Sequence, residues 1–288
     1  MDVTLAALLV VLVAATLHTA WNLIIKQVED KHVFTWWALL VGALLYLPVL
    51  ALSLPVPSSI WPYATASALL EAAYFIALIH AYDRNDFSLV YPIARGAAPA
   101  FLVIWAVLFL GESLPSVGIA GLVVLLSGLM LVAGGSWWAQ RRTVILSTGG
   151  IGASLGVALC ISIYSAIDGA AVRLMAPAPY TELVFALTAV LITPAVLARY
   201  GSHLAAAVWR ARWKTICGVG VMMLLAYMLV LQAYAMAHVS YVGTLREVSV
   251  VLAAVAGWLW LKEGFGVMRT VGAGLIFWGM LLIALGGE

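Results

Sequence analysis

Charged residues are scarce in this chain. They make up 9% of its 288 residues, whereas 65% of the residues are hydrophobic. Soluble domains usually carry about 25% charged residues, so this chain lacks the polar surface that a soluble core of its size would need. The shortage excludes an ordinary cytosolic enzyme, a nucleic-acid-binding domain and a disordered chain, and we expect a lipid bilayer and no nucleic acid around it.

Cysteines and catalytic motifs are equally sparse. Cys160 and Cys217 both lie in apolar runs, which argues against a disulfide framework or a cysteine-based metal site. The five histidines are scattered along the chain and form no metal-binding pattern. No GxxxxGK[ST], HExxH or GxSxG motif occurs, so direct use of ATP is not expected. We therefore expect no enzyme, no metal and no cofactor.

Long apolar runs dominate what remains. A membrane-spanning helix needs roughly 20 mostly apolar residues, and ten runs of about that length alternate with short polar breaks. The sequence therefore predicts an all-α integral membrane protein with ten transmembrane helices. The runs cover residues 3–25, 34–54, 60–82, 87–110, 115–134, 148–172, 180–199, 214–237, 239–261 and 266–286.

The basic residues predict the orientation in the membrane. Eleven of the fourteen Lys and Arg residues lie in, or next to, the loops that follow the odd-numbered runs. Cytoplasmic loops carry the excess of Lys and Arg. We therefore expect both termini on the non-cytoplasmic side of an inner membrane.

Residues 81–134 resemble residues 233–286, which indicates an internal duplication. The chain is interpreted as two five-helix repeats, residues 1–140 and 144–288. Because five is odd, the second repeat enters the membrane from the opposite face. Inverted repeats are common in secondary transporters, with the substrate site near the midplane between the halves. The matching residues are Ala81 with Ala233, Tyr82 with Tyr234, Arg95 with Arg246, and Glu112 with Glu263.

This layout resembles the drug/metabolite transporter superfamily with paired EamA-type domains. The resemblance rests on the ten-run plan, on the stretch from Ser88 to Arg95 (SLVYPIAR), on Leu110-Gly111-Glu112, and on the echo from Arg246 to Glu263. Within the superfamily the chain is most similar to YddG-type exporters, which implies export of aromatic amino acids. One departure is Gly243-Thr244, where the first repeat has Tyr91-Pro92.

Glu71 is the strongest candidate site residue, because an ionisable group at bilayer depth suggests function. It lies near the middle of the third run, and its helical face continues through Tyr74, Leu78 and Tyr82 at spacings of three and four. A carboxylate beside tyrosines can accept a substrate ammonium or carry a proton. The alternative is a structural ion pair with one of the intramembrane arginines.

Arg95 is the candidate for a substrate carboxylate, which a guanidinium binds in a forked geometry. Tyr91 lies one turn before it. Pro92 and Pro99 interrupt the hydrogen-bond ladder around it and predict a kink that serves gating. An interhelical salt bridge is the alternative, since Arg246 occupies the same place in the other repeat.

Three further groups of polar residues lie inside the runs. His18, Trp21 and Asn22 lie close together on the first run and are candidates for substrate binding or for helix–helix contact. Arg246 and Glu247 are assigned a structural or gating role. Asp168 receives the same assignment, and we expect it to reach water because it lies about one turn from the end of its run.

The sequence thus predicts an inner-membrane secondary transporter that exports small metabolites by alternating access. Aromatic or large neutral amino acids are the expected substrates, and a monomer or weak homodimer is the expected state. A broad drug or metabolite exporter of the same fold, a lipid-modifying enzyme and a channel are the alternatives. Proton antiport and facilitated efflux both remain open.

Overall fold

A computed structural model describes residues 3–84, 87–112, 115–139, 148–249, 252 and 267–285 of the chain. All the regular elements in these ranges are helical, as the sequence predicts for an all-α protein. The helices are α1 (Val3–Lys26), α2 (Lys31–Ala51), α3 (Trp61–Arg84), α4 (Phe87–Leu110), α5 (Ser116–Ala139), α6 (Thr148–Ala171), α7 (Pro177–Tyr234), α8 (Val239–Leu245) and α10 (Val267–Leu285), with a 3₁₀ turn at Ser58–Ile60.

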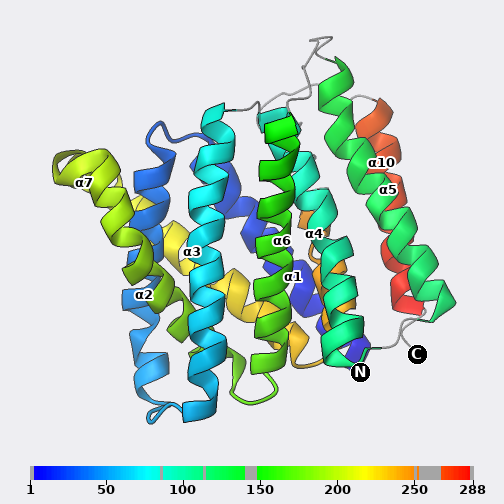
Figure 1. Ribbon diagram of the computed structural model, residues 1–288, viewed down its shortest axis with the longest axis horizontal. Helices are drawn as coiled ribbons and strands as arrows, with labels where there is room; N and C mark the ends of the chain where they lie inside the picture. The colour runs from blue at the N-terminus through cyan, green and yellow to red at the C-terminus, as the bar shows by residue number, and fades with distance from the viewer. Residues whose placement is uncertain are drawn as a thin grey trace.

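The long helices lie side by side, with α2 and α7 at one end of the molecule and α5 and α10 at the other (Figure 1). Helix α1 begins, and α10 ends, at the same edge of the bundle. Because lipid offers no hydrogen-bond partners, helices satisfy their own backbone groups in this environment. Among the described residues, three helices are long and apolar enough to cross a membrane: Leu5–Ile25, Lys31–Ala51 and Pro177–Tyr234.

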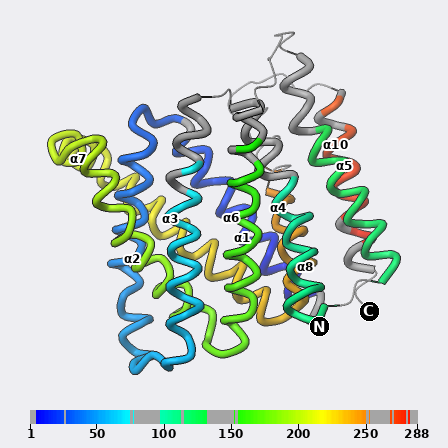
Figure 2. The backbone as a smooth tube through the Cα atoms, in the orientation of Figure 1, coloured from blue at the N-terminus to red at the C-terminus, as the bar shows by residue number. Residues whose placement is uncertain are grey.

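Helix α7 consists of two long legs. A straight helix of its 58 residues would be about 87 Å long, far more than a bilayer needs. The backbone leaves helical geometry at Gly201 (φ 75°, ψ 158°) and at Arg212 (φ −137°, ψ 17°). A positive φ is easy for glycine, which has no Cβ. We call 177–200 the first leg, 201–212 the crossing segment and 213–234 the second leg; Figure 2 follows the chain out and back.

Two close helix pairs form the ends of the bundle. Helix α2 packs mainly against α7, and α5 packs against α10. Glycines allow both contacts: a Cβ on Gly128 would lie 2.6 Å from the carbonyl oxygen of Gly272, and one on Gly42 would lie 2.8 Å from that of Gly220. Small residues let membrane helices approach closely where the hydrophobic effect supplies no drive. The glycines of α5 and α10 thus form a packing face between these two helices.

Short helix α8 is held by a carboxylate from the α4–α5 connection. Glu112 is buried, and its Oε1 accepts a hydrogen bond from the Val239 amide at 2.6 Å. Its Oε2 accepts one from the Ser240 amide at 3.1 Å and one from Ser240 Oγ at 2.5 Å. These bonds satisfy amide donors that a helix start leaves unpaired. The contact joins two segments that are 127 residues apart in sequence.

Replacing Gly220 by Ala tests the α2–α7 contact. The new Cβ would meet the carbonyl oxygen of Ala38, which is backbone and cannot rotate away. We expect a loss of about 1–3 kcal/mol, typical of overpacking, measured as thermal unfolding of the purified protein in detergent. Gly218→Ala is the matched control, because a Cβ there meets nothing within 4 Å; equal unfolding temperatures for the two variants would contradict the packing account.

Candidate functional site

Two buried carboxylates face the interior where α3, α6 and α7 meet. Glu71 comes from the middle of α3 and is 6% exposed, and Asp168 comes from the last turn of α6 and is 0% exposed. The two groups lie within electrostatic reach of each other. Helix α3 packs against both α6 and α7, so the carboxylates lie between the first and second parts of the chain.

Asp168 is held by two tyrosines of α7, one from each leg. The hydroxyl of Tyr180 donates to Oδ1 at 2.7 Å, and that of Tyr227 donates to Oδ2 at 2.5 Å. Hydrogen bonds to an ionised acceptor are short and strong. The expectation that Asp168 reaches water is therefore wrong: the fold of α7 brings two phenols over the end of α6, and their contacts replace solvent.

Among the described residues, Glu71 accepts one hydrogen bond, from Oγ1 of Thr188 to Oε2 at 3.1 Å. Thr188 lies on the first leg of α7, so this bond also joins the two parts of the chain. A buried carboxylate has room for several donors, and the described part of the chain supplies this one hydroxyl to Glu71.

A row of aromatic rings runs beside the carboxylates. The ring centroids of Tyr74 and Tyr164 are 6.4 Å apart, those of Tyr164 and Tyr227 are 6.4 Å apart, and those of Tyr227 and Phe185 are 5.4 Å apart. The row crosses from α3 through α6 to both legs of α7. Such rings offer flat apolar surface to an organic solute while their hydroxyls take part in hydrogen bonds.

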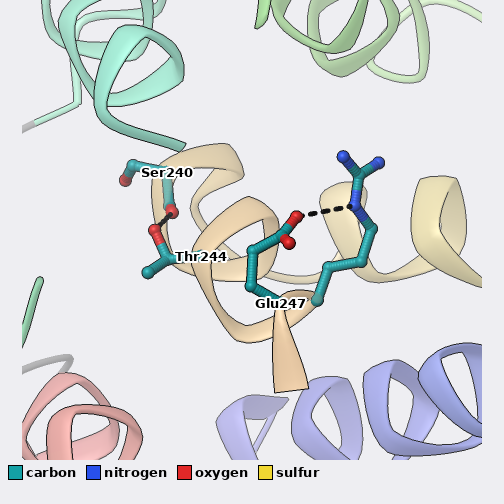
Figure 3. Close-up of polar contacts among 4 residues, drawn as sticks. Ser240, Thr244 and Glu247 are labelled. Atoms are coloured by element: carbon teal, nitrogen blue, oxygen red, sulfur yellow. Dashed lines mark hydrogen bonds and ion pairs between the residues drawn. The ribbon is translucent and has the colours of Figure 1, made fainter. Parts of the chain in front are cut away.

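Arg246 and Glu247 lie just after α8 and are both buried. Arg246 Nε is 3.9 Å from Glu247 Oε1, and Arg246 also lies within electrostatic reach of Asp168. Figure 3 shows Glu247 beside Ser240 and Thr244, and Thr244 Oγ1 donates to the Ser240 carbonyl at 2.7 Å. Consecutive residues within a helix point about 100° apart. Arg246 and Glu247 lie beyond the last residue of α8, where the side chains are not bound to that spacing and can approach each other.

The three α1 candidates lie together. The His18 ring meets Trp21 edge to face at 4.7 Å, and Asn22 Nδ2 donates to the His18 carbonyl at 2.7 Å. The next residue after His18, Thr19, donates from Oγ1 to the carbonyl oxygen of Ser249, which joins α1 to the segment after α8. The ring contact and hydrogen bond of His18, Trp21 and Asn22 thus lie within α1, and the bond to another segment comes from Thr19. Substrate binding and helix–helix contact both stay predictions for the three candidates.

Several candidates fall on positions whose side chains lie outside the described residues. Pro99 is described and is buried in α4. The predicted kink and the forked arginine site therefore remain predictions. The undescribed side chains are those of Leu78, Tyr82, Tyr91, Pro92 and Arg95.

Sequence reasoning missed Glu182 on the first leg of α7. It is 0% exposed, and neither carboxylate oxygen has a hydrogen-bond partner among the described residues. The signal was present in the sequence, because a lone acidic residue inside an apolar run carries the same weight as Glu71. Tyr180 and Thr188 were also missed, since a hydroxyl in a span gives no sign of which neighbour it meets.

Helix α6 separates the carboxylates from an open apolar groove. The groove has a volume of about 460 Å³ and lies between α3, α4 and α6. Its α6 wall is a stripe at helical spacing, Ile163, Ala166, Ile167 and Ala170. Tyr164 and Asp168 form the neighbouring stripe, which belongs to the carboxylate site.

Comparison with known proteins identifies the family. The EamA-like transporter family matches residues 5–134 and again residues 148–285. The chain therefore belongs to this family, within the drug/metabolite transporter superfamily, and carries its paired-domain repeat. It is a multi-pass inner-membrane transporter with a small-molecule substrate.

Individual relatives agree with this class. The chain is 27% identical to the pseudopaline exporter CntI of Pseudomonas aeruginosa, from strains UCBPP-PA14 and PAO1, over 73% of this chain and 68% of the relative. A crystal structure superimposes with a TM-score of 0.73 at 17% identity and covers 98% of both chains. At that identity the likeness shows the fold.

Tyr227→Phe tests the hydrogen bond from Tyr227 to Asp168. It removes one donor from a buried carboxylate, and we expect a loss of about 1–3 kcal/mol in stability, read from thermal unfolding in detergent. Tyr63→Phe, at a residue that lines the apolar groove, is the control and should change little. In an Asp168→Asn background the cost of Tyr227→Phe should shrink; an undiminished cost would show that the phenol acts elsewhere.

Proposed function

We propose that this protein exports a small metabolite that carries an amino group, by alternating access around the Glu71–Asp168 site. Aromatic or large neutral amino acids are the first candidate substrates. The family supports a transporter, and the relative named as an exporter supports the outward direction. The carboxylates lie between the two parts of the chain, which is where transporters built from repeats bind substrate.

The site's charge balance carries the proposal. The described ionisable groups there are three carboxylates, Glu71, Asp168 and Glu247, against one guanidinium, Arg246. Buried charges are costly unless they are compensated. A substrate ammonium, or a proton, would supply the positive charge that this set lacks. A cationic group would thus be stabilised beside these carboxylates.

The aromatic row and the predicted role of Arg95 extend the proposal to the rest of the substrate. The rings of Tyr74, Tyr164 and Tyr227 would pack against an apolar side chain. Arg95 would take the substrate carboxylate in its forked geometry. The resulting site would fit a zwitterion with an apolar side chain, as an aromatic amino acid is.

The membrane arrangement we propose has ten spans in two inverted five-helix repeats, with both termini outside the cytoplasm. The two legs of α7 would be two of the proposed spans. Helix α1 starts at the same edge of the bundle at which α10 ends, which favours an even number of crossings. Residues 1–140 and 144–288 would form the repeats. Pro92 and Pro99 in α4 would allow the bending that opens one mouth at a time.

A second candidate is export of another metabolite or of drugs. The name of the relative favours it, since that protein exports pseudopaline. Both candidates need the same fold and differ in substrate alone.

Solute counterflow separates the candidates. Purified protein in proteoliposomes preloaded with unlabelled phenylalanine should accumulate labelled phenylalanine transiently, because a carrier exchanges solute. A lipophilic cation preload should not support this uptake. Phenylpropionate, which lacks the amino group, should compete poorly. If the cation drives exchange and phenylalanine does not, the drug exporter is correct; flux without saturation or counterflow would indicate a channel.

Glu71→Gln tests the carboxylate directly. It keeps the shape and the bond with Thr188 but removes the charge, so we expect at least a tenfold loss in substrate affinity. Binding is measured as the ligand-induced rise in unfolding temperature. Glu29→Gln, exposed in the α1–α2 connection, is the control. If Glu71 also carries a proton, the variant loses the pH dependence of transport; unchanged pH dependence assigns coupling to another group.

A further inference from the structure

The crossing segment of α7 and its two ends form a strongly basic surface. Between Glu182 and Glu247 the sequence contains no acidic residue. The neighbouring α1–α2 connection contributes two acidic and two basic residues, Lys26, Glu29, Asp30 and Lys31, which cancel. The surface therefore keeps its positive charge. Its basic side chains are all exposed: Arg199, Arg210, Arg212 and Lys214.

The inner face of this segment is fixed to α2 by aromatic contacts. Trp37 Nε1 donates to the Ala205 carbonyl at 2.8 Å, and the Trp37 ring lies 4.9 Å from that of Trp209. Ala205 and Val208 are buried in the same cluster as the α2 residues. One side of the segment thus belongs to the core while its arginines face outward, which is the pattern of an amphipathic interfacial helix.

The position of the segment places its charges at one edge of the bundle. It lies at the edge opposite the start of α1 (Figure 1). Trp213 follows it and is 49% exposed, with the Lys214 ammonium 5.7 Å from its ring centroid. Tryptophan and basic residues in this combination are typical of the depth at which lipid headgroups lie.

We propose that the exposed face of residues 199–214 binds the phosphate headgroup of an anionic phospholipid. Arg210 and Arg212 present planar forks that match phosphate oxygens, and Lys214 adds a third positive charge beside Trp213. The bound lipid fixes the crossing segment at the membrane surface. The site is separate from the carboxylate site, so it stands whether or not the transport proposal does.

Native mass spectrometry of the full chain in neutral detergent tests this proposal. The probe is an equimolar mixture of dioleoyl phosphatidylglycerol and dioleoyl phosphatidylcholine, and the readout is the ratio of the two lipids retained. Wild-type protein should retain the anionic lipid preferentially. R210Q/R212Q/K214Q should lower that ratio by more than about tenfold, given about fivefold for each basic residue near a lipid surface. Raised salt should lower the wild-type ratio as well.

R173Q is the matched control, because Arg173 is also exposed but lies in the α6–α7 connection at the other edge. It should leave the ratio unchanged. If the triple variant yields no folded protein, R210Q alone carries the test, with an about fivefold fall expected. The proposal is overturned if the variants keep the wild-type ratio, if R173Q lowers it equally, or if millimolar inorganic phosphate displaces the anionic lipid.

Discussion

Burying Glu71 and Asp168 together in a membrane protein is the constraint from which the rest follows. Two carboxylates within electrostatic reach repel each other, and neither tolerates an apolar setting unless it is compensated. The chain compensates Asp168 with two phenols and Glu71 with one hydroxyl. Hydroxyl groups bring hydrogen bonds but no positive charge, and in the described part of the chain Arg246 is the guanidinium within electrostatic reach of Asp168. The proposed function assigns the remaining compensation to an affinity for a cationic group of the solute. A carrier can use that affinity, because it must release its solute as well as bind it.

The fold of α7 makes this compensation possible. Its first leg brings Tyr180 and Thr188 to the carboxylates, and its second leg brings Tyr227. The breaks at Gly201 and Arg212 allow the two legs to lie in one bundle. The crossing segment that joins them is anchored to α2 through Trp37. Movement of this segment would therefore reach the site through both legs.

The sequence predicted the helical class, the family and a carboxylate inside the bundle at Glu71, since each depends on composition, periodicity or a local motif. It could not predict the partners of Asp168. The distance along α6 suggested water, whereas the actual neighbours come from 12 and 59 residues further along the chain. Glu182 could have been found from the sequence, because it is an acidic residue inside an apolar run. It was overlooked because it belongs to no recognisable motif. Contacts between distant segments depend on how helices pack, which a single sequence does not specify.

A structure determined with a saturating amino-group solute tests the central claim most directly. The account predicts density for the solute between α3, α6 and α7, with its nitrogen within hydrogen-bonding distance of Glu71 or Asp168 and its apolar part against Tyr164 or Tyr227. Solute bound elsewhere, or α3, α6 and α7 closed on one another with no space for a solute in any state of the cycle, would contradict it.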